Sequence, residues 1–336
     1  MQGAQKSQGQ QDLYVRMDGR KDGPRDGVSM RHCIFLALIA AGAALYGGPL
    51  AELGALFSRS ELHQHIPLIP LVSGYFVFLN RREIFRGGGW SPRIGAAMIA
   101  AGGLYRVMAG MAETGPDRND YLSAMMLGLV IWTLGSFVIS YGIQGLKAGL
   151  FPMLFLAFTV PVPDFILEPS VAFLQAASAG AADLVFKITG VPYLREGMIF
   201  SLPGINVEVA EQCSGIRSSL ALVITTIVAG KLFLRNGYGK AALVLAVIPV
   251  TIFKNGLRIV TLSLLASYVD PIFITGHWIH RSGGIPFFIV GLIMLAPVLW
   301  FLRRVEARKE TARNFTSNLC SSKLQQMAGA TKAGTD

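Results

Sequence analysis

The fold is decided by the stretch Cys213-Ser-Gly-Ile-Arg217-Ser-Ser-Leu-Ala-Leu-Val-Ile-Thr-Thr-Ile-Val-Ala-Gly230, in which a cysteine leads into an apolar run. The run is typical of a membrane-spanning helix, whereas the preceding Ile205-Asn-Val-Glu-Val209 alternates like a short strand. The thiol is therefore expected beside a helix N-terminus, where unpaired backbone N–H groups favour the thiolate. Arg217 follows on the same helix face and adds positive charge. Cys213 is thus a candidate nucleophile.

The composition indicates a multi-pass membrane protein. Of the 336 residues, 52% are hydrophobic and 15% are charged, and the mean hydropathy is +0.49. A soluble globular domain carries more charge than this. We expect an all-α bundle of about eight transmembrane helices, because eight apolar segments cross or nearly cross a hydrocarbon core of about 30 Å. These segments are 33–51, 66–80, 93–112, 121–144, 148–163, 213–234, 241–269 and 284–302.

The basic residues indicate the orientation of these helices. In an eight-span arrangement, 21 of the Lys and Arg residues fall on one side and five on the other. The positive-inside rule then predicts that both termini are cytoplasmic. The net charge of +10 is thus a topology signal and does not indicate nucleic-acid binding. Cys33 and Cys320 fall on the inner side and Cys213 on the outer side, so we expect no disulfide.

The chain has three predicted parts. Residues 1–32 are polar and are expected to form a disordered cytoplasmic segment, residues 33–302 form the bundle, and residues 303–336 form a basic, then polar, cytoplasmic tail. Within the bundle, 164–212 is the longest stretch between spans and is predicted to be a small extracytoplasmic insertion before the sixth span.

The insertion is expected to contain a helix and a hairpin. A helical apolar stripe covers residues 164–189, and Pro203-Gly204 separates two β-prone runs. The hairpin would deliver the chain directly into Cys213. It would also suit an extended peptide that adds to it as a further strand.

Four basic residues and no acidic residue fall inside the predicted spans. A charge in the hydrocarbon costs several kcal/mol, so each of them requires a reason. They are Arg106, Arg217, Lys254 and Arg258.

The seventh predicted span contains two of these charges. Arg258 lies about 16 Å from its outer end, too deep for easy snorkelling, and Asn255 shares its face. Pro249 is expected to kink this helix. Arg258 either binds negative charge in a polar cavity or is a structural pin bonded to backbone carbonyls. Lys254 is expected to reach a different partner.

Two histidines, His277 and His280, precede the last span on the outer side. Histidine can take a thiol proton or stabilise developing charge near neutral pH. Their spacing also suits a metal, but no nearby acid or second cysteine completes a ligand set. We therefore expect neither a metal nor a cofactor.

Three motifs in order resemble the exosortase/archaeosortase family of integral membrane cysteine transpeptidases. They are Cys213-Ser214-Gly215 with the following Ile-Arg-Ser, Asn255-Gly-Leu-Arg258, and His280-Arg-Ser-Gly-Gly284 before the last span. The approach through Leu-Pro-Gly and Val-Ala-x-x-Cys is also similar. The resemblance covers roughly residues 60–305, and a histidine at position 280 is similar to the bacterial branch rather than the archaeal one.

The resemblance implies cleavage of C-terminal sorting signals of the PEP-CTERM kind, each with a Pro-Glu-Pro-like motif, a transmembrane helix and a basic cluster. It implies that Cys213 forms an acyl-thioester, that Arg258 donates a proton or stabilises charge, and that His280 supports the transition state. We favour an electrostatic role for Arg258, because a guanidinium does not readily give up its proton in a protein. Arg217, Asn255, His277, Ser214 and Gly215 would support the site or bind substrate. The implied setting is the inner membrane of a bacterium, with the site at the extracytoplasmic face and an acceptor nucleophile still to be identified.

Two alternative functions fit parts of the pattern. A transporter or flippase could line an anion path with Arg106, Arg258 and Asn255, although no repeated half accompanies the one Pro-interrupted helix. A non-catalytic assembly factor for the export of exopolysaccharide or surface proteins would use the bundle as a scaffold. In neither alternative is the thiol essential.

Overall fold

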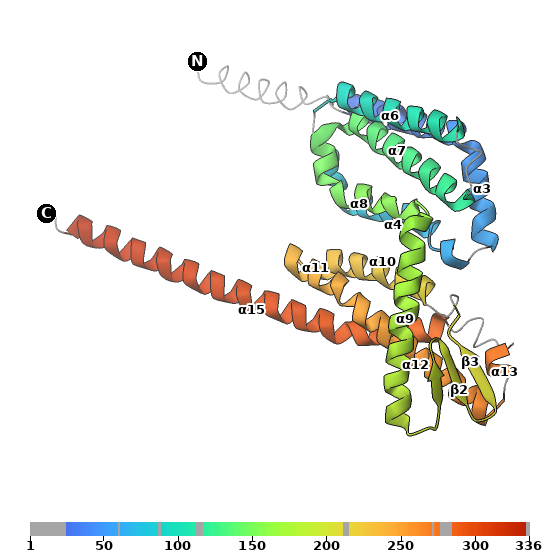
Figure 1. Ribbon diagram of the computed structural model, residues 1–336. Helices are drawn as coiled ribbons and strands as arrows, with labels where there is room; N and C mark the ends of the chain where they lie inside the picture. Colours follow the sequence, from blue (N-terminus) through green and yellow to red (C-terminus); the bar gives the residue numbers. More distant parts are fainter. Residues whose placement is uncertain are drawn as a thin grey trace, which may run out of the picture. The chain divides into compact units, whose positions relative to one another are not determined.

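The computed structural model describes residues 25–59, 61–86, 89–111, 117–210, 215–270, 272–275 and 284–333 (Figure 1). It divides into two compact units, Met1–Asp164 and Phe165–Asp336. Each unit contains buried hydrophobic clusters of its own.

The regular elements of unit 1 are all helices among its described residues. Its elements are α2 (Arg25–Leu45), α3 (Gly47–Arg59), η1 (Glu61–His63), α4 (Leu68–Leu79), α5 (Arg81–Ile84), α6 (Pro92–Met111), α7 (Arg118–Ala148), α8 (Leu150–Phe155) and η2 (Leu156–Thr159).

Helices α6 and α7 pack with their backbones close together, because glycines line the contact. A Cβ atom at Gly102 would lie 2.9 Å from the carbonyl oxygen of Gly128. A Cβ atom at Gly135 would lie 2.8 Å from the carbonyl oxygen of Gly95. Small residues allow such approaches between membrane helices, where packing rather than the hydrophobic effect drives association.

The neighbouring glycines Gly102 and Gly103 provide a matched test of this contact. Gly102→Ala should destabilise the protein by about 1–3 kcal/mol, because the added methyl group meets the α7 backbone. Gly103→Ala should stay within about 0.5 kcal/mol, because its nearest neighbour would be a Trp132 ring atom at 3.6 Å. Thermal unfolding of both variants in detergent measures the difference. Equal melting temperatures would show that the close approach is unimportant.

A buried histidine lies in the connection between α3 and α4. The His63 side chain is only 7% exposed. Burial is the main cause that lowers the pKa of His63 below 6.5, and His65 acts in the same direction. Asn119 and Asp164 partly oppose this shift. The folded protein therefore favours the neutral imidazole.

The lowered pKa predicts an acid-sensitive unit 1. A histidine with a depressed pKa in the folded state contributes stability above about pH 6.5, and this contribution is lost as the pH falls below that value, because the unfolded chain binds the proton more readily. We expect the melting temperature to fall between pH 7.5 and 5, and to fall less in His63→Leu. An unchanged slope in this variant would contradict the assignment.

Unit 2 combines long helices with one small sheet. Its elements are α9 (Asp164–Thr189), β1 (Leu194–Glu196), β2 (Ile199–Leu202), β3 (Ile205–Glu208), α10 (Ile216–Phe233), α11 (Gly237–Leu245), α12 (Val247–Tyr268), α13 (Ile272–Thr275) and α15 (Gly284–Ala333). The strands are antiparallel in the order β1-β2-β3, and β2 and β3 meet at the expected Pro203-Gly204 turn.

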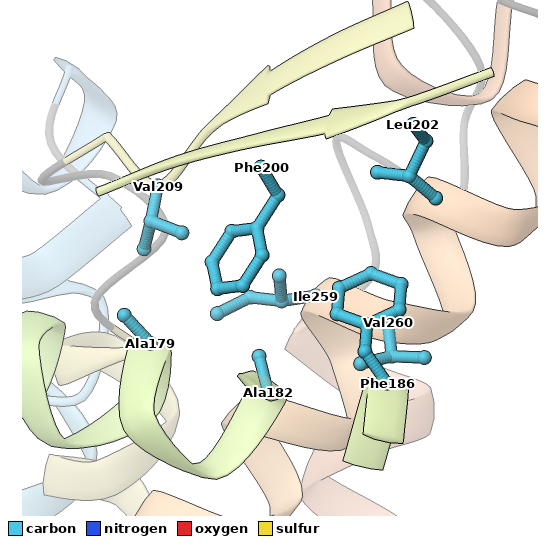
Figure 2. Close-up of a cluster of buried hydrophobic side chains, with 8 residues drawn as sticks. All are labelled: Ala179, Ala182, Phe186, Phe200, Leu202, Val209, Ile259 and Val260. Carbon is cyan, nitrogen blue, oxygen red and sulfur yellow. The ribbon is translucent and has the colours of Figure 1, made fainter. Parts of the chain in front are cut away.

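The sheet, α9 and α12 enclose one hydrophobic core, shown in Figure 2. Phe186 of α9 and Phe200 of β2 are fully buried in this core, and their ring centroids lie 5.4 Å apart. The α12 residues Ile259 and Val260 complete it from below the sheet in this view. The C-terminal half of α12 therefore packs against α9 and the sheet.

The seventh predicted span is one apolar segment, Gly237–Tyr268, with a break at Ala246 between α11 and α12. Pro249 explains the break, because a proline cannot donate to the carbonyl four residues earlier and its ring clashes with that group. The predicted kink therefore lies where this mechanism requires it.

The predicted number of eight spans is not confirmed. In the described chain, five helices have the length and apolarity to cross a membrane, and a sixth does so if α2 and α3, bent by 75°, form one broken span. The predicted spans 66–80 and 148–163 are short, because α4 has 12 residues and α8 has six. Helix α9, expected to lie outside, is among the five. The structure is thus a helical membrane protein with a smaller count of candidate spans.

Candidate functional site

In the sequence, the predicted site residues run from the segment just before α10 to the segment just before α15. Four of them lie outside the described residues: Cys213, Ser214, His277 and His280. For these four, the structure describes only the neighbouring segments. Gly215, Arg217, Asn255 and Arg258 are described.

Gly215 is the residue at which the chain turns into α10. It has a left-handed backbone, with φ of 74° and ψ of 12°, a conformation that L side chains rarely adopt. A Cβ atom at this position would lie 2.7 Å from Asn255 Oδ1. Glycine is therefore required at this position both for its conformation and for the close approach of α12.

Asn255 is held in place by the packing of α12 on α9. It is 1% exposed, and its neighbour Gly256 faces α9, where an added Cβ would lie 2.7 Å from Ala181 Cβ. The predicted pair Asn255 and Arg258 is buried, since Arg258 is 8% exposed. These two site residues thus lie on a part of α12 that packs against Gly215 on one side and against α9 on another.

The position of Arg258 along the helix axes follows from where α10 begins and where α12 ends. Lys254 bonds to Ser218 near the start of α10, so the start of α10 lies beside the turn of α12 that precedes Arg258. Beyond Asn255, α12 continues for about 20 Å, and this part packs against α9 and the sheet. Arg258 therefore lies far from the C-terminal end of α12 but close to the N-terminal start of α10.

Lys254 is a residue whose role the sequence did not identify. It is 1% exposed, and its ammonium donates to Ser218 Oγ. Ser218 Oγ in turn donates to the carbonyl oxygen of Gly215 over 3.0 Å. Only the expectation that Lys254 would reach another partner pointed to this bond.

The chain that enters the site is anchored before Cys213. Gln175 of α9 donates to the carbonyl oxygen of Val209 over 2.6 Å, and Val209 N donates to Met198 over 2.9 Å. Ser267 of α12 holds the hairpin turn at Pro203. The segment with the thiol therefore runs between two fixed points, Val209 and Gly215.

Covalent geometry limits the reach of the flanking segments. Cys213 is two residues from Gly215, so their Cα atoms lie within about 7 Å. His280 is four residues from Gly284, the first residue of α15, and so lies within about 14 Å of it. Helix α15 contacts α10, α11 and α12. These limits are compatible with one site at the start of α10.

Positive charge gathers at this site. Arg258 is close enough to repel both Arg217 and Lys254 electrostatically. The sequence from 215 to 269 contains no acidic residue. Such an arrangement favours an anionic species, including a thiolate or an oxyanion.

Three carboxylates in unit 1 have spacing that suits a metal. The ligand atoms of Asp117, Asp120 and Asp164 lie within 4.8 Å of one another. Two of the three already have local bonds, because Asp120 Oδ1 accepts from Asp164 N and Asp164 Oδ1 accepts from Asn119 Nδ2. The sequence did not predict this group, and two of its three carboxylates already act as hydrogen-bond acceptors within unit 1.

Gly215→Ala tests whether the geometry at the start of α10 matters. The substitution should destabilise the folded state by roughly 1–2 kcal/mol through its left-handed backbone, and more through the contact with Asn255. The rate of Cys213 alkylation should change as well. Gly180→Ala is the control, because nothing lies within 4 Å of its added methyl group. Equal behaviour of the two variants would exclude a special role for Gly215.

The comparisons with known proteins give one finding. The family model described as transmembrane exosortase matches residues 57–297, more than two thirds of the chain. No curated protein and no solved structure matches.

Proposed function

Because the chain belongs to the transmembrane exosortase family, we propose that it is a membrane cysteine peptidase or transpeptidase that cleaves C-terminal sorting signals at Cys213. Family membership itself points to a role in processing sorting signals on membrane-associated proteins. The cysteine chemistry and the individual residue roles are our proposal.

One observation carries the proposal. Asn255 Oδ1 lies 2.7 Å from the Cβ position of Gly215, so the part of α12 with Arg258 packs against the turn that follows Cys213. Two motifs that are about 40 residues apart in the sequence are thereby brought together. This proximity is what a thiol and a charge-stabilising guanidinium require.

The proposed reaction proceeds through an acyl-enzyme. The Cys213 thiolate attacks the scissile carbonyl, and the resulting oxyanion is stabilised by Arg258. The C–N bond then breaks, and His280 gives its proton to the leaving amine, which produces a thioester. An acceptor attacks the thioester carbonyl and gives its proton to His280, and the C–S bond breaks to release the Cys213 thiolate, so that water yields hydrolysis and an amine yields transfer.

The proposed location is the inner membrane of a bacterium, with both termini cytoplasmic. The charge distribution supports this orientation. Glu306 of α15 accepts from the backbone N–H groups of Arg235 and Asn236. The basic α10–α11 connection and the basic end of α15 therefore lie on one side of unit 2, as the proposed topology requires. The start of α10 then faces the extracytoplasmic side.

Processing of a reporter tests the function. The reporter carries a C-terminal Pro-Glu-Pro motif, a transmembrane helix and an arginine cluster, and is co-expressed with the enzyme. Cys213→Ala should abolish cleavage, and Arg258→Ala should reduce it by about 100- to 1,000-fold through loss of oxyanion stabilisation. His280→Ala should impair cleavage more than His277→Ala.

Matched cysteine variants provide the control. Cys33→Ala and Cys320→Ala should leave cleavage intact, because both lie on the other side of the proposed topology. Unimpaired cleavage in Cys213→Ala would refute the proposal. Solute transport that survives this change but requires Arg258 would favour the transporter, and surface export that survives both changes would favour the assembly factor.

A further inference from the structure

Lys254 connects three helices at the candidate site. Its ammonium donates to Ser218 of α10. Its stem lies against α15, where a Cβ atom at Gly291 would approach Lys254 Cδ to 3.3 Å and Leu222 to 3.2 Å. The residue itself belongs to α12 and is 1% exposed. One side chain therefore fixes the positions of α10, α12 and α15 relative to one another.

The bond to Ser218 extends to the turn before α10. Lys254 donates to Ser218 Oγ, and Ser218 Oγ donates to the carbonyl oxygen of Gly215. Each bond in such a chain polarises the next one. The left-handed turn at Gly215 is thus supported from α12 by two contacts, this hydrogen-bond chain and the Asn255 side chain.

Burying a lysine side chain at this position is energetically unfavourable. A buried ammonium loses its hydration, and Arg258 repels it from one turn away. An apolar side chain of similar length would fill the same space without either cost. The charge therefore requires a role beyond filling volume.

We propose that Lys254 is a positioning residue for the reaction at Cys213, acting through Ser218 on the turn at Gly215. This inference rests on the proposed function. Lys254 supports the backbone conformation of Gly215, two residues after Cys213, and it contacts α15, which begins four residues after His280. Its charge adds to the positive potential that Arg258 and Arg217 create.

The kinetics of the purified enzyme on the reporter test this inference. Lys254→Met keeps the stem length and removes the charge, and Ser218→Ala removes only the linking oxygen. Each should lower kcat by about 10- to 100-fold and leave KM within about twofold, because positioning acts on the transition state. The double variant should be no slower than the slower single variant, since both changes break one chain of bonds.

Ser219 provides the matched control. Its hydroxyl also donates to the carbonyl oxygen of Gly215, over 2.6 Å, and among the described residues the hydrogen bond of Lys254 goes to Ser218 and not to Ser219. Ser219→Ala combined with Lys254→Met should therefore show multiplied single effects. If Ser218→Ala combined with Lys254→Met also showed multiplied single effects on kcat, the inference would be overturned. If Lys254→Met does not fold, the difference in kcat between Ser218→Ala and Ser219→Ala carries the test, and equal values overturn it.

A second readout does not depend on cleavage. In a Cys33→Ser, Cys320→Ser background, the pH profile of Cys213 alkylation by a membrane-impermeant maleimide should move upward by about one unit in Lys254→Met. Lys240→Met, which removes a lysine beside Gly230 at the other end of α10, should leave the profile unchanged. A shifted profile without any reporter cleavage by the parent enzyme would refute the proposed function, and with it the kinetic role of Lys254, and would leave only an electrostatic effect of Lys254 on the thiol. If the parent enzyme cleaves the reporter and Lys254→Met changes neither kcat nor the alkylation profile, the role of Lys254 is refuted and the proposed function is not.

Discussion

The absence of a side chain at Gly215 is the constraint on which the site depends. The left-handed turn and the approach of Asn255 both use the space that a Cβ atom would occupy. Because α12 can come this close, its buried Lys254 and Arg258 lie beside the start of α10. The rest of unit 2 supports this approach, with Gly256 allowing α12 to pack equally closely on α9.

The same packing explains how the protein tolerates buried charge. Arg258 would be hard to accommodate if α12 were surrounded by lipid, since a guanidinium in hydrocarbon is costly. Instead, the C-terminal half of α12 packs against α9 and the sheet, and the core around Phe186 and Phe200 covers it. Several buried hydroxyl, amide and cationic groups can therefore share a protein environment of higher effective polarity than lipid.

Much of the local structure was predictable from the sequence, because it follows from periodicity and turn chemistry. The bounds of α9 agree with its apolar stripe, the hairpin turns at Pro203-Gly204, and a helix begins shortly after Cys213. Strand β1 was missed because it has three residues, two of them charged. The count of eight spans stays a prediction: among the described residues five or six helices have the length and apolarity to cross a membrane, and the predicted spans 66–80 and 148–163 contain helices of only 12 and six residues. The chain from Lys254 through Ser218 to Gly215 was beyond prediction, since it joins residues 36 positions apart through packing that no local pattern records.

The length of α15 has a mechanical consequence. The helix is held near one end, where Gly291 meets Lys254, and again about 22 Å further along, where Glu306 binds the connection between α10 and α11. Sliding it by one residue would shift it by about 1.5 Å and disturb both attachments together. Helix α15 is therefore held against sliding along its own axis by two separate attachments.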